Sequence, residues 1–293
     1  MKKLSTLFLI FGTVLLVVTN SLCEETTNFA YLRNSIGAKP VSMGEASGGL
    51  ADDVYSIFYN PAGISFVDNY SLLFSHIEFF QGIRYEITSG IIPVSKNTSI
   101  GISAIYINNG LQEKRDISGN PGGEFAPYQI IPIISFGKNL TSEISIGANV
   151  KIPYEVIDDY SNFKVLFDLA GFFKANSNYS FGINLQNVGV YENLPINLKL
   201  GAGYNDNLLK MGFDINIPYK SSMIFNLGGE IKVIENLFLR GGLKYKLYTN
   251  FDFISNVTLG FGFKFDIFSI DYGFKYYDEL GNTHFVSLVV NFK

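Results

Sequence analysis

Few residues in this chain are of the types that catalyse reactions or bind metal ions. The sequence holds two histidines, His76 and His284, a single cysteine, Cys23, and no Gly-x-Ser-x-Gly motif, so it offers no evident pair of nucleophile and base. The adjacent carboxylates Asp52 and Asp53 could bind a cation, but we expect them to cap a short helical turn or to pair with a basic residue. The histidines could meet if the strands that carry them were neighbours, yet solvated or interfacial positions are the simpler expectation. These residues favour a protein that is not an enzyme and that needs no metal or cofactor.

The composition points to a membrane rather than to water or nucleic acid. Charged residues make up 16% of the 293 residues, against roughly 25% in an ordinary soluble domain. The charge balance is slightly acidic, with Lys+Arg 22 against Asp+Glu 26, which gives no electrostatic reason to expect nucleic acid as a partner. After the N-terminal apolar stretch, no window reaches 18 uninterrupted apolar residues, so a bundle of membrane-spanning helices is excluded.

Residues 1–23 have the three-part pattern of a secretory signal peptide. Two lysines precede an apolar run at 7–18, and small and polar residues follow it. We expect cleavage near residues 21–23. Cys23 raises the alternative of a lipoprotein, although Leu22 is a poor fit to the small residue that normally precedes a lipidated cysteine. The pattern predicts that the protein is exported.

Beyond the leader, hydrophobic residues recur at every second position. In residues 143–152, for example, Ile144, Ile146 and Val150 fall on one face of a strand, while Asn149 and Lys151 fall on the other. Segments of about ten residues with this pattern match the height of tilted membrane-spanning strands. Fourteen such segments are present, at 70–79, 83–93, 99–107, 127–136, 143–154, 163–173, 179–186, 196–204, 209–217, 223–233, 237–247, 253–265, 268–276 and 284–292.

The lengths of the connections alternate as they do in outer-membrane barrels, which have longer extracellular loops and short periplasmic turns. The long connections fall on one side and comprise residues 108–126, 155–162 and 187–195. The short turns fall on the other side and comprise residues 176–178, 205–207 and 234–236. The short connection at 80–82 is an exception to this pattern. The last strand contains an aromatic residue, Phe292, near its end, as the last strands of outer-membrane barrels usually do. The sequence therefore predicts an all-β fold, a transmembrane antiparallel β-barrel of about fourteen strands over residues 68–293, in the bacterial outer membrane.

Residues 24–67 do not alternate and form a segment of their own. They are rich in glycine and alanine, and Asn60-Pro61 indicates a turn after an apolar stretch. Fourteen strands enclose a bore wider than side chains alone can fill. We therefore expect this segment to lie in the lumen as a plug, with a periplasmic appendage as the alternative.

Residues 35–65 resemble the N-terminal signature of the FadL-type outer-membrane superfamily, which includes long-chain fatty-acid transporters and the PorV/PorQ-like and UPF0164-like branches. The signature runs from Gly-Ala through Met-Gly-Glu-Ala and Ala-Asp-Asp to Asn-Pro-Ala-Gly. The residues that carry it here include Gly37, Met43, Gly44, Asp52, Asp53, Asn60, Pro61, Ala62 and Gly63. The resemblance implies a fourteen-stranded barrel closed by an N-terminal hatch, with the Asn-Pro-Ala turn holding the hatch against the wall.

Two functions follow from the resemblance. In the transporter branch a hydrophobic ligand binds inside the barrel and moves once the hatch shifts, so our first expectation is passage of small hydrophobic compounds through a barrel surrounded by outer-membrane lipid. In the PorV-like branch the barrel instead binds secretion-system proteins, which is the alternative. The short extracellular loops favour the smaller PorV-like members and leave little room for a high-affinity capture site.

Basic residues on the polar faces of the strands are the remaining candidates for a site. Those expected to face the lumen are Arg84, Lys151, Lys199, Arg240, Lys244 and Lys264. They could attract the carboxylate of an amphipathic ligand, but we expect them to seat the hatch by pairing with acidic residues. The expected acidic partners are Asp52, Asp53, Glu86 and Glu230. Glycine pairs such as Gly241-Gly242 are expected to leave space opposite the plug.

Overall fold

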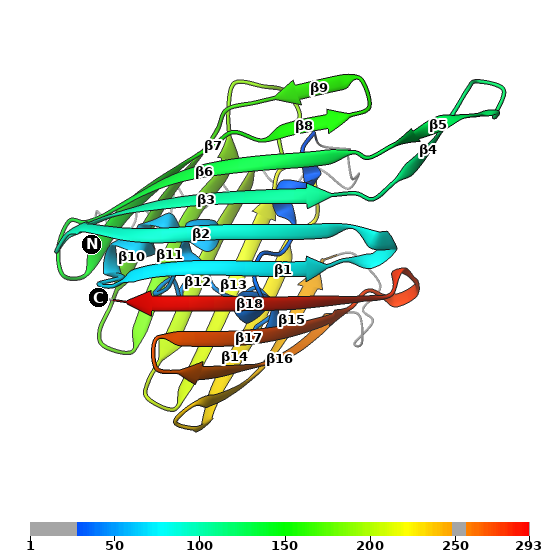
Figure 1. Ribbon diagram of the computed structural model, residues 1–293. Helices are drawn as coiled ribbons and strands as arrows, with labels where there is room; N and C mark the ends of the chain where they lie inside the picture. Colours follow the sequence, from blue (N-terminus) through cyan, green and yellow to red (C-terminus); the bar gives the residue numbers. More distant parts are fainter. Residues whose placement is uncertain (1–27, 248–255, 293) are drawn as a thin grey trace.

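The computed structural model describes residues 28–247 and 256–292. The predicted leader and the start of the strand predicted at 253–265 lie outside these ranges. Within them, the main sheet has 16 strands, of which all but β8 and β9 line one closed antiparallel barrel (Figure 1). Each barrel strand pairs with the next barrel strand along the chain, and β18 closes the barrel by pairing with β1.

The fourteen barrel strands coincide with the fourteen predicted segments to within a few residues. They are β1 (Tyr70–Glu78), β2 (Arg84–Ser95), β3 (Thr98–Asn108), β6 (Tyr128–Asn139), β7 (Ile144–Lys151), β10 (Leu166–Lys174), β11 (Tyr179–Val188), β12 (Asn197–Asn205), β13 (Leu209–Pro218), β14 (Ile224–Ile234), β15 (Leu237–Lys246), β16 (Val257–Phe265), β17 (Phe268–Tyr276) and β18 (Asn282–Phe292). The predicted fold class, a transmembrane barrel of fourteen antiparallel strands, is confirmed.

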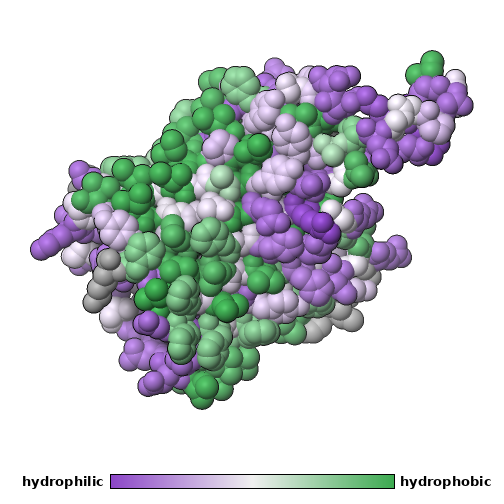
Figure 2. Space-filling view, viewed as in Figure 1, coloured by the Kyte–Doolittle hydropathy of each residue, from purple (hydrophilic) through white to green (hydrophobic). Residues whose placement is uncertain are grey.

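The alternation of each strand separates a lipid face from an inner face. On β7, Ser145 and Asn149 are buried inside the barrel, whereas Ile144 and Ile146 are exposed on its outer surface. Figure 2 shows apolar side chains gathered over the middle of the strands on the outer surface and hydrophilic ones near the end that carries the long hairpin. An exposed apolar band of this kind is stable when lipid covers it.

The two ends of the barrel differ in the length of their connections, as predicted. One end carries short turns, such as those at 96–97, 175–178 and 235–236. The other end carries two hairpins, β4 (Gln112–Arg115) with β5 (Pro121–Phe125) and β8 (Tyr154–Ile157) with β9 (Tyr160–Phe163), together with the short 3₁₀ turns η3 (Phe80–Gly82) and η4 (Asp278–Leu280). The end with the hairpins is therefore the extracellular end.

The N-terminal segment, residues 28–67, folds into short helical turns instead of strands. These are η1 (Ala30–Arg33), α2 (Ala38–Ser42), α3 (Ser56–Tyr59) and η2 (Pro61–Phe66). Nearly all of residues 35–65 are buried, and their contacts are with inward-facing residues of strands around the barrel. No helix among the described residues is long and apolar enough to cross a membrane. The segment thus lies in the lumen, on the inner wall.

The inner wall has two chemically different halves. Strands β18, β1, β2, β3 and β6 present buried apolar side chains to the lumen, among them Leu73, Ile87 and Ile131, and these pack with Ile57 and Tyr59 of the N-terminal segment. The remaining strands present mainly buried polar and charged side chains to the lumen. The N-terminal segment is therefore held by hydrophobic packing on one side and by hydrogen bonds and ion pairs on the other.

Candidate functional site

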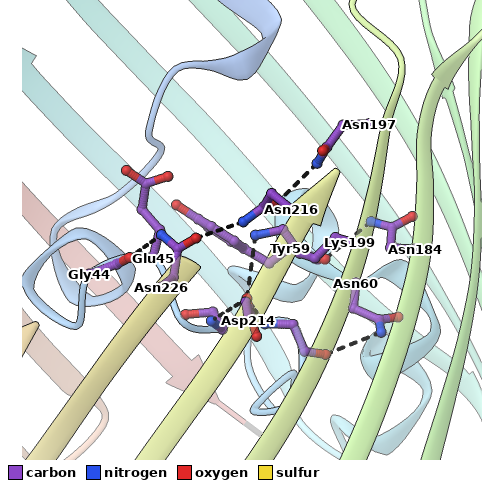
Figure 3. Close-up of polar contacts among 12 residues, drawn as sticks. Gly44, Glu45, Tyr59, Asn60, Asn184, Asn197, Lys199, Asp214, Asn216 and Asn226 are labelled. Carbon is purple, nitrogen blue, oxygen red and sulfur yellow. Dashed lines mark hydrogen bonds and ion pairs between the residues drawn. The ribbon is translucent and has the colours of Figure 1, made fainter. Parts of the chain in front are cut away.

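Side-chain amides of the polar half bind the backbone of the N-terminal segment (Figure 3). Three of the amide nitrogens donate to carbonyls of the short helix α3, since the last carbonyls of a helix have no intrahelical donor, and a fourth donates to the carbonyl of Gly44, which follows α2. The pairs are Asn149 to Ile57 at 2.9 Å, Gln186 to Phe58 at 3.1 Å, Asn184 to Tyr59 at 3.1 Å, and Asn226 to Gly44. These amides were not among the expected site residues, although Asn149, Asn184 and Gln186 stand at inward positions of alternating strands.

Asp214 on β13 binds backbone N–H groups of the same segment. Its Oδ2 accepts hydrogen bonds from the N–H groups of Ser47 and Gly48, at 3.0 and 2.8 Å. The ammonium group of Lys199 lies 3.4 Å from the same oxygen and 5.0 Å from the centre of the Tyr59 ring. This buried carboxylate therefore links the segment to two neighbouring strands.

The Asn-Pro-Ala-Gly motif forms a compact turn against the wall. Asn60 is fully buried; its Oδ1 accepts from the N–H of Ala62 at 3.1 Å, and its Nδ2 donates to the carbonyls of Gly48 and Gly171, both at 3.2 Å. Pro61 occupies the first turn of η2, where its missing N–H has no consequence. Asn60 thus ties η2 both to an earlier part of the segment and to β10.

The other motif residues lie close to the wall or to the segment itself. A Cβ added at Gly63 would lie 2.2 Å from the carbonyl oxygen of Ala51, so only glycine fits there. Gly37 and Gly44 have positive φ angles of 82° and 62°, a region that favours glycine. Met43 is buried, and its carbonyl oxygen faces Gly228 of β14.

The two adjacent aspartates have separate partners. Asp52 pairs with Lys210 of β13 at 3.0 Å. Asp53 pairs with Lys39 of the same segment at 2.7 Å, and its Oδ1 accepts from the N–H of Tyr55 at 2.9 Å, just before α3. The two aspartates therefore form separate ion pairs, and Asp53 also binds a backbone N–H ahead of α3, whose own N-cap residue, Tyr55, makes no side-chain cap hydrogen bond. Within the described residues, no group of three or more His, Cys, Asp or Glu side chains is arranged to hold a metal ion.

Four of the six basic candidates form buried or half-buried ion pairs in the lumen. The pairs are Lys151 with Asp168 at 2.8 Å, Lys199 with Asp214, Arg240 with Glu230 at 2.6 Å and with Asp271 at 2.7 Å, and Lys244 with Glu45 at 2.8 Å. Only the last of these joins the wall to the N-terminal segment, whereas the others join strands of the wall to one another; Arg240 of β15 reaches both the neighbouring β14 and, across β16, β17. Lys264 lines the cavity at the periplasmic end.

Arg84 and Glu86 differ from the expectation that they face the lumen. On β2, Tyr85 and Ile87 are the buried, inward-facing residues, so the pleat directs Arg84 and Glu86 to the outer surface. Arg84 pairs there with Glu78 at 2.9 Å. The error comes from treating every charged residue as lumenal, because the outer surface also becomes polar where a strand leaves the membrane.

Both histidines also lie on the outer surface at the extracellular end, on the neighbouring strands β1 and β18. Nδ1 of His76 is 2.7 Å from Glu86, and Nδ1 of His284 is 2.8 Å from the hydroxyl of Tyr272. Both contacts are solvent-exposed. These positions agree with solvated or interfacial histidines.

Glu45, like Asp52, couples the N-terminal segment to a wall lysine, and it was not among the acidic partners expected from the sequence. Its two carboxylate oxygens each lie 2.8 Å from the Nζ of Lys244, and one also accepts from Ser35. Burial alone would raise the pKa of Glu45, but the charges of Lys244 and Lys275 and the hydrogen bonds outweigh it and lower the pKa to about 2. Glu45 is therefore ionised at neutral pH.

The N-terminal segment separates two cavities. The extracellular cavity, of about 100 Å³, has one apolar side that includes Ile105, Ile131 and Phe58 and one polar side that includes Asn197 and Lys199. The periplasmic cavity is larger, about 400 Å³, and is lined mainly by polar and charged residues. The extracellular cavity is the candidate binding site, because ligand sites combine apolar surface with a few placed polar groups.

No family model matches the chain, and no curated protein is similar to it in sequence. Among solved structures, it is similar to the Ralstonia pickettii toluene transporter TbuX (TM-score 0.63, 12% identity, 88% of this chain and 97% of that one). The chain has the fold of FadL-type outer-membrane channels. The P. putida toluene transporter TodX (TM-score 0.60, 14% identity, 88% and 99% covered) and a Pseudomonas aeruginosa FadL homologue (TM-score 0.58, 13% identity, 93% and 99% covered) share it. At these identities the comparison concerns the fold, and at that level it confirms the resemblance given by residues 35–65.

Proposed function

We propose that this protein is an outer-membrane channel for small hydrophobic compounds and that its N-terminal segment is the hatch. The observation that carries the proposal is the extracellular cavity, whose apolar side is formed by isoleucines of β3 and β6 and by Phe58 of the segment. The extracellular end of the barrel is exposed to water. An apolar cavity surface there allows hydrophobic molecules to leave the solvent and bind. The similarity in fold to toluene transporters supports the same function.

Passage requires that the N-terminal segment move. The segment lies between the two cavities and fills the lumen with buried side chains, including Val41, Ile57 and Ile64. Its polar contacts with the wall are mostly neutral hydrogen bonds, each worth a net of about 1 kcal/mol. A set of such bonds can be exchanged for water one at a time, so we infer that the seating is stable but reversible.

The surroundings of the barrel fit this role. Large apolar side chains such as Phe74, Phe136, Phe181 and Phe261 are exposed on its outer surface, where outer-membrane lipid would cover them. We infer that the chain is a channel rather than an enzyme. The alternative role, a barrel that binds secretion-system proteins, is favoured only by the shortness of the extracellular loops, and the similarities in fold do not favour it.

Uptake of radiolabelled toluene tests the proposal. Bacteria whose own outer membrane lacks a hydrocarbon channel would express the protein, and uptake would be compared with that of cells expressing an unrelated porin of similar abundance. We expect faster initial uptake with this protein at low toluene concentration. Equal rates in the two strains would contradict the proposal.

A further inference from the structure

A chain of hydrogen-bonded amide side chains runs from the N-terminal segment to the polar side of the extracellular cavity (Figure 3). The segment fixes which atom of each amide donates and which accepts. The chain begins at the carbonyl of Gly44, which accepts from Nδ2 of Asn226. Oδ1 of Asn226 then accepts from Nδ2 of Asn216 at 2.7 Å, and Oδ1 of Asn216 accepts from Nδ2 of Asn197 at 3.1 Å. A backbone carbonyl can only accept, so each amide in turn must present its nitrogen toward Gly44 and its oxygen away from it.

A second route reaches Asn197 with the same direction. The carbonyl of Phe58 accepts from Nε2 of Gln186 at 3.1 Å, and Oε1 of Gln186 accepts from Nδ2 of Asn197 at 2.9 Å. Both routes therefore use the nitrogen of Asn197 as donor. Neither route uses the side-chain oxygen of Asn197, which can only accept a hydrogen bond.

This oxygen has no hydrogen-bond partner among the described residues. Asn197 is 8% exposed, it lines the extracellular cavity, and its Oδ1 is buried without a donor. A buried acceptor without a donor is costly, and native structures rarely leave one. The site is therefore complementary to a molecule that brings its own O–H or N–H group.

A donor lies beside this acceptor. Lys199 stands two residues further along β12, so its side chain lies on the same, inward face as that of Asn197. Its ammonium has three hydrogens, and it pairs with Asp214 at 3.4 Å. Asn197 and Lys199 both line the cavity, and they hold between them one unpartnered acceptor and one ammonium donor. A hydroxyl group is both a donor and an acceptor.

The opposite side of the cavity recognises an apolar body. Ile105, Ile107, Ile131 and Ile133 line it, together with Phe58. A volume of about 100 Å³ is of the order of the cavity of about 150 Å³ that is known to bind benzene in an engineered protein. The cavity therefore suits a molecule with about one ring.

We propose that the extracellular cavity selects small hydroxylated hydrophobic molecules, of the phenol class, over the corresponding hydrocarbons. This inference rests on the proposed function only for its location and deepens it by naming the ligand class. A purely apolar pocket separates such a pair weakly, whereas a site with buried polar groups rejects the analogue that leaves them unpaired. Carboxylates are disfavoured because carboxylates of the protein already balance the charges of Lys151, Lys199 and Lys244, although the ammonium of Lys199 has further hydrogens that can bind a neutral hydroxyl.

Equilibrium dialysis of radiolabelled probes against purified protein, with the same detergent on both sides of the membrane, tests this selection. Phenol, anisole, toluene and benzoate have similar size and differ in hydrogen-bonding groups. We expect phenol to bind at least about tenfold more tightly than toluene and anisole, because anisole accepts but cannot donate. Equal binding of phenol and anisole, or tighter binding of benzoate, would overturn the proposal.

A pair of variants ties the selection to Asn197. Asn197→Leu removes the acceptor at nearly constant volume, and we expect it to weaken phenol binding about tenfold and to leave toluene binding unchanged. The matched control is Asn139→Leu, whose amide binds Ser65 near the short turns at the other end of the barrel, and it should retain the phenol preference. Circular dichroism would verify that both variants are folded. Dialysis measures binding without passage, so failure of transport with intact phenol selection would count against the proposed function alone, and loss of selection with intact toluene uptake would count against this inference alone.

Discussion

Glu45 shows how a single residue joins the signature of the N-terminal segment to the barrel. It follows Gly44, and both residues have positive φ angles, 62° and 65°. Glycine adopts this conformation at no cost, but a glutamate in it is uncommon and is held by its surroundings. Here the surroundings are Ser35 of the segment and Lys244 of β15. The ion pair with the wall thus offsets the unfavourable backbone conformation of Glu45.

Removal of this charge should destabilise the protein in a pH-dependent way. Glu45→Gln leaves Lys244 without its carboxylate, and we expect a loss of about 2 kcal/mol in the free energy of unfolding at pH 7. The pKa of Glu45 is lowered to about 2 from an ordinary value near 4.5, so its charge stabilises the fold above the ordinary value, and the contribution is lost as the pH falls toward 2. The difference between wild type and variant in urea unfolding should therefore be constant from pH 7 to 5 and shrink below about pH 4.5.

Glu124→Gln, in the exposed β4–β5 hairpin, is the matched control. It should change the free energy of unfolding by less than about 0.5 kcal/mol at every pH. A difference for Glu45→Gln that persists undiminished down to pH 2.5 would show that the ion pair is not the cause.

Individual contacts were less predictable than the motif that contains them. Asn60, Pro61 and Gly63 stand out in the sequence because turns need these residue types. The partners of the segment do not stand out, because Asn184 and Asn226 are single polar residues on strands whose closure brings them together. Closure is a long-range property, and no local pattern reports which inward residue meets which carbonyl.

At the scale of elements, β13, β14 and β15 approach the N-terminal segment closely through glycines. A Cβ added at Gly242 of β15 would lie 2.0 Å from the backbone nitrogen of Gly44, and one at Gly228 of β14 would lie 1.9 Å from the carbonyl oxygen of Met43. At these glycines the strands have no side chains, so the backbone of residues 43–46 packs directly on the backbone of the strands. Gly241 faces outward instead, so only one member of the pair singled out in the sequence leaves space for the segment.

Alanine at these two glycines should have opposite outcomes. Gly242→Ala places a methyl group against backbone atoms that cannot rotate away, so we expect displacement of the N-terminal segment and a higher ion conductance in planar bilayers. In Gly241→Ala the nearest atom, Cδ2 of Leu259, is 3.9 Å from the new Cβ, and conductance should equal that of wild type. Equal conductance of all three proteins would contradict the close packing of the segment on β15.

The strands were predictable from sequence because alternation is a local signal, and β7 and β16 show it clearly. The apolar half of the inner wall was not identified. On β6 the run Ile130, Ile131, Ile133 and Ile134 is apolar on both faces, which is the pattern of a strand buried on both sides. Strand β6 is apolar on both faces because the N-terminal segment packs on its inner face. The hairpins β4–β5 and β8–β9 were also missed, since they extend beyond the membrane and lack its hydrophobic pattern.

The molecule as a whole is a barrel with a two-sided lumen, and its N-terminal segment packs against both halves of the inner wall. The apolar half and the isoleucine side of the extracellular cavity are continuous across β3 and β6. The polar half holds the segment by hydrogen bonds that water can replace. We propose that small hydrophobic compounds pass through the barrel only when this segment moves.

A reversible disulfide between the segment and the wall would test whether passage needs this movement. The N–H of Ala38 donates to the hydroxyl of Ser287 on β18 at 2.9 Å, so Ala38→Cys with Ser287→Cys places two thiols within reach of a disulfide. Cys23→Ser would remove the natural cysteine from the background. Because the segment already continues into β1, a tether at residue 38 fixes both of its ends. Initial toluene uptake would be compared before and after a reductant, with each single cysteine variant as control.

We expect slow toluene uptake while the disulfide is intact, recovery to the wild-type rate after reduction, and no effect of reductant on the single variants. Uptake by the oxidised double variant at the wild-type rate would show that compounds pass without movement of the segment.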